Sequence, residues 1–202
     1  GRSQEALESA MLALELQPDL SDAVQRCEQL AVQLEDAACF ARIHELAVPH
    51  LPGKKSEQAF HYRFAKSFEQ KFVDLPRALS LYLSSLSLSP KAGAALESVE
   101  RISHRLQKHD ALVRSARLLR SAGRDRSYVA QFLQRNTERF LEEDNLASAY
   151  NLVMDAIIDD PGLDLVEVVQ LMARRSQAGR SSAQKVVQKW IASLETSIAE
   201  RA

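Results

Sequence analysis

Apolar side chains recur at intervals of three and four residues along most of the chain, which predicts helices throughout. The glycines and prolines stand between these periodic segments, as at Pro52–Gly53, Gly123 and Gly179, where they end helices. The sequence contains no Asn-Gly or Asp-Gly hairpin turn, and β-branched residues do not cluster as strands require. We therefore predict an all-α protein of about eleven helices. They are expected at residues 3–16, 20–35, 37–50, 55–72, 75–88, 91–107, 109–122, 126–142, 145–159, 162–176 and 181–201.

The segment from Arg77 to Pro90, RALSLYLSSLSLSP, is the most ambiguous because apolar and polar residues alternate in parts of it. Asp74 before it suits an N-cap, and Pro76 suits the first turn of a helix. Its apolar residues also recur at helical spacing: Ala78, Leu79, Tyr82, Leu83 and Leu86. The segment is therefore predicted to be a helix that ends near the proline.

A spacing of mostly small residues before a closing proline occurs three times, at offsets of 0, 4, 7 and 12 residues. The three sets are Ala6, Ala10, Ala13 and Pro18; Ala78, Tyr82, Ser85 and Pro90; and Ala149, Val153, Ala156 and Pro161. Successive closing prolines are 72 and 71 residues apart, which is the length of two helix pairs. The pattern predicts a helical repeat whose alanines lie at close helix contacts.

These residues resemble the second helix of a tetratricopeptide repeat, a 34-residue helix-turn-helix unit. The likeness is strongest at 59–90, and it rests there on Tyr62, Ala65, Ala78, Tyr82 and Pro90. The first-helix glycine of the family is replaced in three successive units, by Glu28, Lys66 and Glu100. The chain is therefore described as tetratricopeptide-like.

The resemblance implies a right-handed α-solenoid of stacked antiparallel helix pairs, in a single domain over residues 1–202. Its units are expected near 1–18 (a half unit), 21–52, 59–90, 91–125, 126–161 and 162–202, the last including a C-terminal cap. One face of the final helix carries the apolar residues expected of that cap: Val187, Trp190, Ile191, Leu194 and Ile198. Trp190 is interpreted as an anchor of the cap.

The resemblance also implies a function, because solenoids of this family bind peptides or partner domains on a concave surface. The family's groove positions correspond here to Gln25, Gln29, Arg63, Ser67, Gln70, Arg101, His104, Gln131, Gln134 and Glu138. The Lys/Asn pattern with which some members clamp a terminal carboxylate is absent, and only Arg63 and Arg101 could partly replace it. We expect a non-enzymatic scaffold for a peptide or protein partner.

Charge suggests an alternative, because the net charge of −1 conceals two segregated blocks. Residues 101–126 include eight Lys or Arg, and residues 138–167 include nine Asp or Glu. The basic block is either an outer face neutralised by neighbouring acids or an anion site. Candidate anion-binding residues are Arg105, Lys108, Arg114, Arg117 and Arg120. Nucleic acid is a less favoured partner, because no aromatic residue lies between Tyr82 and Tyr128 to stack on bases.

No sequence motif indicates an enzyme. The chain lacks a Gly-rich phosphate loop, His-Glu-x-x-His and a nucleophile elbow, and we expect no cofactor. Neither His44 and His50 nor His104 and His109 have the spacing of a helical metal site, so no metal is expected. Two cysteines without Cys-x-x-Cys spacing and the lack of a long apolar run favour a cytoplasmic protein without a membrane span.

The N-terminal segment 5–18 matches the second helix of a unit, although only four residues precede it. Its large apolar residues, Leu7, Met11 and Leu14, are therefore expected to be only partly covered by the next helix. This predicts self-association through that helix, or coverage by sequence that precedes it.

Overall fold

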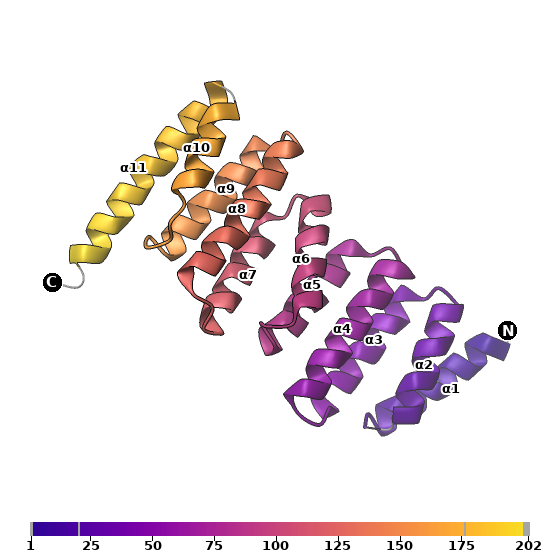
Figure 1. Cartoon of the computed structure of the whole chain (residues 1–202). Helices are drawn as coiled ribbons and strands as arrows, with labels where there is room; N and C mark the ends of the chain where they lie inside the picture. Colours follow the sequence, from indigo (N-terminus) through magenta and orange to yellow (C-terminus); the bar gives the residue numbers. More distant parts are fainter. Residues whose placement is uncertain (1, 20, 176, 200–202) are drawn as a thin grey trace. The chain divides into compact units, whose positions relative to one another are not determined.

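The computed structural model describes residues 2–19, 21–175 and 177–199, and within these ranges the chain forms eleven α-helices and no strand (Figure 1). The expected helix ends at 20, 176 and 201 and the side chain of Ile198 lie outside the described residues. The helices are α1 (Arg2–Leu16), α2 (Ser21–Gln33), α3 (Ala37–Ala47), α4 (Lys54–Gln70), α5 (Leu75–Leu88), α6 (Gly93–Leu106), α7 (His109–Ser121), α8 (Arg126–Glu142), α9 (Leu146–Asp159), α10 (Val166–Arg175) and α11 (Gln177–Ala199). A 3-10 turn, η1 (Val48–His50), follows α3.

The ambiguous segment at 77–90 is helical, as predicted. The Asp74 side chain accepts a hydrogen bond from the Arg77 backbone N–H and caps α5, and Pro76 lies in its first turn. Of the serines in the segment, Ser85 is buried, and its hydroxyl donates to the backbone oxygen of Gln58 on α4. The apparent alternation therefore comes from small polar residues at a helix contact and on the exposed face.

Two helix starts differ from the prediction. The helix expected from 162 begins at Val166, because the backbone first turns at Asp160, whose oxygen accepts from the Leu163 N–H. The helix expected from 181 begins at Gln177, so Gly179 lies inside α11 and does not separate two helices.

The chain divides into two compact units, unit 1 (residues 1–89) and unit 2 (residues 90–202). Unit 1 comprises α1 to α5, and consecutive helices pack against each other from α1 to α3 and between α4 and α5. An aromatic cluster lies in its core: the ring of Phe40 is 4.4 Å from that of Phe64 and 5.2 Å from that of Phe68. All three side chains are buried, so this cluster joins α3 to α4.

Unit 2 comprises α6 to α11, arranged in two layers. The even-numbered helices α6, α8 and α10 contact one another in turn, and so do the odd-numbered helices α7, α9 and α11. The pairs α6–α7, α8–α9 and α10–α11 join the layers (Figure 1). This pairwise packing agrees with a helical repeat. The right-handed winding, the tetratricopeptide-like arrangement and the single domain over 1–202 remain predictions.

The same turn follows α2, α4, α6 and α8. In each turn one non-glycine residue takes the left-handed conformation, with φ between 55° and 57°: Glu35, Val73, Gln107 and Asp144. The next backbone N–H then bonds back to the last turn of the helix, as from Asp74 to the Phe68 oxygen at 2.9 Å. Asp36, Asp74 and Asn145 cap the helix that follows. Local sequence therefore builds repeated hairpins of helices.

The three sets of small residues do not all occupy equivalent places. Ala78 and Ala149 are fully buried, as the repeat predicted. Ala6 and Ala10 are only half-buried and Ala13 is exposed, whereas Leu7 and Leu14 are buried. The prediction for the N-terminal set was therefore wrong. Because α1 packs on only one side, against α2 and α3, burying leucines removes more apolar area from water than burying alanines.

The buried face of α11 also differs from the apolar face that was expected to close the last unit. Ala183 and Val186 are buried and Trp190 is half-buried, whereas Val187, Ile191 and Leu194 are exposed. The indole N–H of Trp190 donates to the Pro161 oxygen at 2.7 Å, so Trp190 ties α11 to the turn after α9. No described helix is long and apolar enough to span a membrane.

Candidate functional site

The residues predicted to bind a partner lie on even-numbered helices in both units. In unit 1 they are Gln25 and Gln29 on α2, and Arg63, Ser67 and Gln70 on α4. In unit 2 they are Arg101 and His104 on α6, and Gln131, Gln134 and Glu138 on α8. All except His104 are at least partly exposed.

Unit 1 has a groove of about 400 Å³ that includes two of these residues, Gln25 and Arg63. Its walls come from the turn before α2, from α2, from the 3-10 turn after α3 and from α4. Polar groups of Asp19, Ser21 and His50 line it together with apolar surface from residues such as Leu51 and Phe60. Such a mixture suits a peptide better than a small apolar ligand.

Arg63 is held in place inside unit 1. Its guanidinium donates to Glu28 on α2 at 2.7 Å and lies over the rings of Phe60 and Phe64, 5.1 Å and 5.7 Å from their centroids. Burial raises the pKa of Glu28 to about 7, although the neighbouring Arg63 charge opposes the rise. Arg63 therefore ties α4 to α2 and leaves only its remaining surface exposed to solvent.

Unit 2 contains a second copy of this arrangement, which was not among the residues predicted from the sequence. Arg135 on α8 donates to Glu100 on α6 at 2.5 Å, and its guanidinium lies 5.9 Å from the Phe132 ring centroid. The corresponding residues of the two copies are 72 residues apart: Glu28 and Glu100, Phe60 and Phe132, and Arg63 and Arg135. This spacing matches that of Pro18 and Pro90, and a search for charged and aromatic pairs at that period could have found it.

His104 was predicted to face a partner, and the structure contradicts this because its side chain is 1% exposed. Its Nε2 donates to the Asn136 oxygen at 2.9 Å, and its ring packs 4.2 Å from that of Phe140. Burial lowers the pKa of His104, which keeps the ring neutral. The side chain joins α6 to α8, because its Nε2 bonds Asn136 and its ring packs on Phe140, while its buried Nδ1 has no hydrogen-bond partner among the described residues.

A groove of about 710 Å³ in unit 2 lies between α8 and α10. It brings together two predicted residues, Gln131 and Gln134, with residues of the α9–α10 turn and α10 that the sequence analysis did not select: Gly162, Asp164, Val166, Glu167 and Gln170. Arg126 also lines the groove, and its guanidinium lies against Gly162, where a Cβ atom would come within 2.9 Å of it. Glycine is therefore required at 162 for this position of the arginine.

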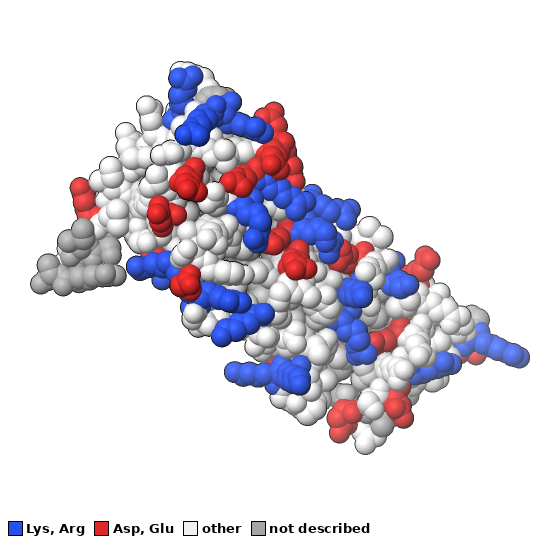
Figure 2. Space-filling view, viewed as in Figure 1, with Lys and Arg blue, Asp and Glu red and all other residues white. Residues whose placement is uncertain are grey.

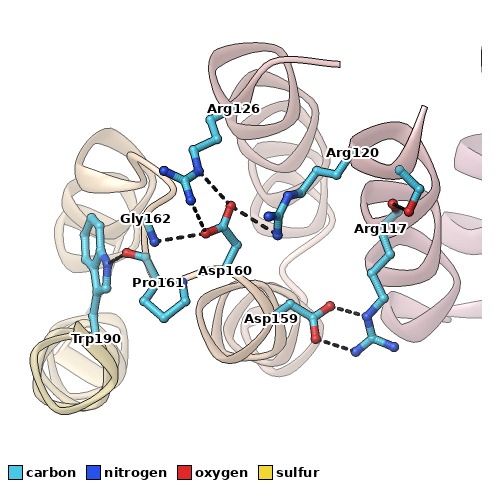
Figure 3. Close-up of polar contacts among 9 residues, drawn as sticks. Arg117, Arg120, Arg126, Asp159, Asp160, Pro161, Gly162 and Trp190 are labelled. Carbon is cyan, nitrogen blue, oxygen red and sulfur yellow. Dashed lines mark hydrogen bonds and ion pairs between the residues drawn. The ribbon is translucent and has the colours of Figure 1, made fainter. Parts of the chain in front are cut away.

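Three arginines of the basic block are paired with acids of the acidic block (Figure 3). Arg117 binds both oxygens of Asp159, with Nη2 to Oδ1 at 2.7 Å. Arg120 and Arg126 both bind Asp160, each with an approach of 3.1 Å. Asp160 is buried at 4% exposure and also accepts from the Gly162 N–H. Neutralisation by neighbouring acids, the first interpretation of the basic block, is correct for these arginines.

The other candidate anion-binding residues are Arg105, Lys108 and Arg114, which are exposed and have no ion-pair partner among the described residues. Figure 2 shows positive and negative side chains interspersed over most of the visible face. The five candidates therefore do not act as one set, because Arg117 and Arg120 are already neutralised.

Two histidines that are distant in the sequence meet in unit 1. His44 Nε2 on α3 and His61 Nδ1 on α4 are 2.9 Å apart, and His61 Nε2 lies 3.5 Å from a Glu57 oxygen. The described part of the chain contains no group of three or more His, Cys, Asp or Glu side chains arranged to hold a metal ion. The two cysteines are free thiols, and burial raises the pKa of Cys27 to about 11.

The residues predicted for self-association are mostly inside unit 1. Leu7 and Leu14 are 2% and 0% exposed, and Met11 is half-buried. The large exposed apolar side chains of α1 are Leu12 and Leu16, at 59% and 77%. The expected exposure of Leu7 and Leu14 was therefore wrong, because α2 and α3 together cover the face that carries them.

Comparison of the chain with models of known protein families and with curated proteins found no match.

Proposed function

We propose that this chain is a non-enzymatic interaction module that binds a peptide or a partner domain in the grooves of its even-numbered helices. One observation carries the proposal: each unit has an open groove that contains two residues predicted from the groove positions of the tetratricopeptide family. These are Gln25 and Arg63 in unit 1 and Gln131 and Gln134 in unit 2. The resemblance to tetratricopeptide repeats, whose concave surfaces bind peptides, supports the same function.

The chemistry of the grooves also supports a peptide or protein partner. Glutamine side chains offer one acceptor and two donors, which match the N–H and C=O groups of a polypeptide. The larger groove has acidic residues, Asp164 and Glu167, on its wall, and these would repel a phosphate backbone.

The experiment is affinity capture of partners followed by measurement of their affinity for variants of the protein. Gln131→Ala combined with Gln134→Ala should weaken a partner that uses unit 2, and Arg63→Gln should weaken one that uses unit 1. Gln33→Ala is the control, because Gln33 is an exposed residue of α2 outside both grooves. Retention of full affinity by all the groove variants, with unchanged helix content, would contradict the proposal.

Binding of an anion or nucleic acid through segment 101–126 is the alternative. It would rely on Arg105, Lys108 and Arg114, because their basic neighbours Arg117 and Arg120 are ion-paired. Salt separates the two functions: phosphate binding through three cations should weaken by roughly tenfold or more between low and moderate salt, whereas binding in the grooves should change little.

A further inference from the structure

The groove between α8 and α10 continues onto α11. A second groove, of about 610 Å³, lies between α10 and α11, and Gln170 lines both. The residues of this second groove are Val169, Gln170, Ala173, Arg180, Ala183, Gln184, Val187 and Gln188. The two grooves therefore form one path across three helices of unit 2, which we call the glutamine groove.

Five glutamines line this path: Gln131 and Gln134 on α8, Gln170 on α10, and Gln184 and Gln188 on α11. Gln134 donates to Glu138 at 3.0 Å, whereas the other four make no side-chain hydrogen bond to another described residue. Their amides can therefore pair with the backbone of an extended peptide. Neighbouring helix axes are about 8–10 Å apart, so a path over three helices accommodates about six extended residues.

The two ends of the glutamine groove differ in chemistry. At the α8–α10 end, Asp164 and Glu167 have no ion-pair partner among the described residues. Arg126 at this end shares buried Asp160 with Arg120, so together with Asp164 and Glu167 three acids lie near two arginines. This end therefore favours a positive side chain. At the α10–α11 end, the exposed side chain of Val187 offers apolar surface, and Figure 2 shows a mostly uncharged surface over α11.

We propose that the glutamine groove binds an extended peptide segment that places a Lys or Arg side chain near Asp164 and Glu167 and an apolar side chain against Val187. Since the two ends are about one helix spacing apart, these side chains are separated by about three residues of the peptide. The inference rests on the proposed function, because it specifies the partner that one of its grooves selects.

The test uses fluorescein-labelled peptide mixtures about eight residues long, blocked at both ends, in a background of Ser, Ala and Gly. One mixture carries a lysine and a leucine separated by about two to four residues, the second has glutamate for lysine, and the third has serine for leucine. Fluorescence polarisation with the full chain should show that the lysine–leucine mixture binds about fivefold or more tightly than the glutamate mixture.

Variants of the protein locate the site. Asp164→Asn combined with Glu167→Gln should remove the preference for lysine over glutamate. The side-chain oxygen of Asp164 accepts a hydrogen bond from the Val166 N–H, and the asparagine amide oxygen can still accept it. Val187→Thr should weaken the affinity for the lysine–leucine mixture about threefold and leave the affinity for the serine mixture unchanged. The matched control is Glu142→Gln combined with Asp144→Asn, two exposed acids near the end of α8 outside the groove, and it should keep the preference.

The outcomes separate this inference from the proposed function. If the peptides bind but the groove variants behave like the control, the inference is wrong, while peptide binding elsewhere, as in the groove of Arg63, still agrees with the proposed function. If the peptides then fail to bind the Arg63→Gln variant, the peptide-binding site lies in the groove of unit 1. If no mixture binds measurably, the inference is overturned and the proposed function is left to folded partner domains.

Discussion

His44 on α3 and His61 on α4 form a hydrogen bond of 2.9 Å between their imidazole rings. The bond requires a lone pair on one of the two nitrogens, so the rings cannot both be protonated while it persists. His44 also packs against the rings of Phe60 and Phe64, and only His61 is near an acid, Glu57. Burial, and to a lesser extent the neighbouring His61, lowers the pKa of His44 to about 4.

The first prediction is a loss of stability in acid that depends on His44. Between its ordinary pKa of 6.5 and its folded value of about 4, the unfolded chain binds a proton that the folded chain does not. The free energy of unfolding should therefore fall as pH decreases through this window, by at most about 3 kcal/mol from this group. Denaturant unfolding at several pH values, in wild type and His44→Phe, measures the effect. The variant should show a shallower loss, and His50→Gln, which changes an exposed histidine, should follow wild type.

The second prediction concerns Glu28, whose pKa is raised to about 7 chiefly by burial. Between its ordinary 4.5 and about 7, the folded state holds a proton that the unfolded state has released, so this group lowers stability as pH rises through that window. Glu28→Gln removes the dependence and can still accept from Arg63. The free energy of unfolding of the variant minus that of wild type should therefore increase by about 2 kcal/mol as the pH rises from about 4.5 to 8. Glu97→Gln, on the exposed face of α6, should show no such trend, and a parallel response of the two variants would refute the argument.

A third prediction follows from Val73, a β-branched residue with φ of 55° that is 69% exposed. Its Cβ atom is strained in the left-handed region and its side chain gains little from burial. Val73→Gly should therefore increase the free energy of unfolding by about 1 kcal/mol. Val187→Gly, in the regular helix α11, should decrease it by about the same amount. Thermal and denaturant unfolding of both variants decides the point, and destabilisation by both would show that Val73 is not strained.

The fourth prediction tests the different packing of two matching alanines. Ala78 is fully buried, so Ala78→Leu should overpack the contacts of α5 and cost about 1–3 kcal/mol. Ala6 is half-buried on α1, so Ala6→Leu should change stability by less than about 0.5 kcal/mol. The midpoints of denaturant unfolding should rank the two variants in this order. Equal losses would mean that the repeat pattern, and not the packing of α1, describes the N-terminal helix.

The sequence by itself determined where most of the helices lie, because helical spacing and caps depend on interactions between neighbouring residues, although it misplaced the starts of α10 and α11. Asp74 caps α5 and Pro76 occupies its first turn, as their positions in the sequence predicted. Gln25, Arg63, Gln131 and Gln134, which the resemblance to tetratricopeptide repeats selected, line the grooves of the two units. Helical spacing and capping require no knowledge of the distant chain.

The tertiary structure decided which face of each helix is buried and which charges meet. Periodicity could not distinguish Leu7 from Ala6 as the buried residue of α1, because that choice depends on the surface that α2 and α3 offer. It could not reveal that His104 is enclosed by Phe140 and Asn136, since they lie on another helix. Nor could it pair Arg126 with Asp160 or extend the groove to α11. Burial and ion pairing depend on residues more than 30 positions away, and only the packed helices bring these together.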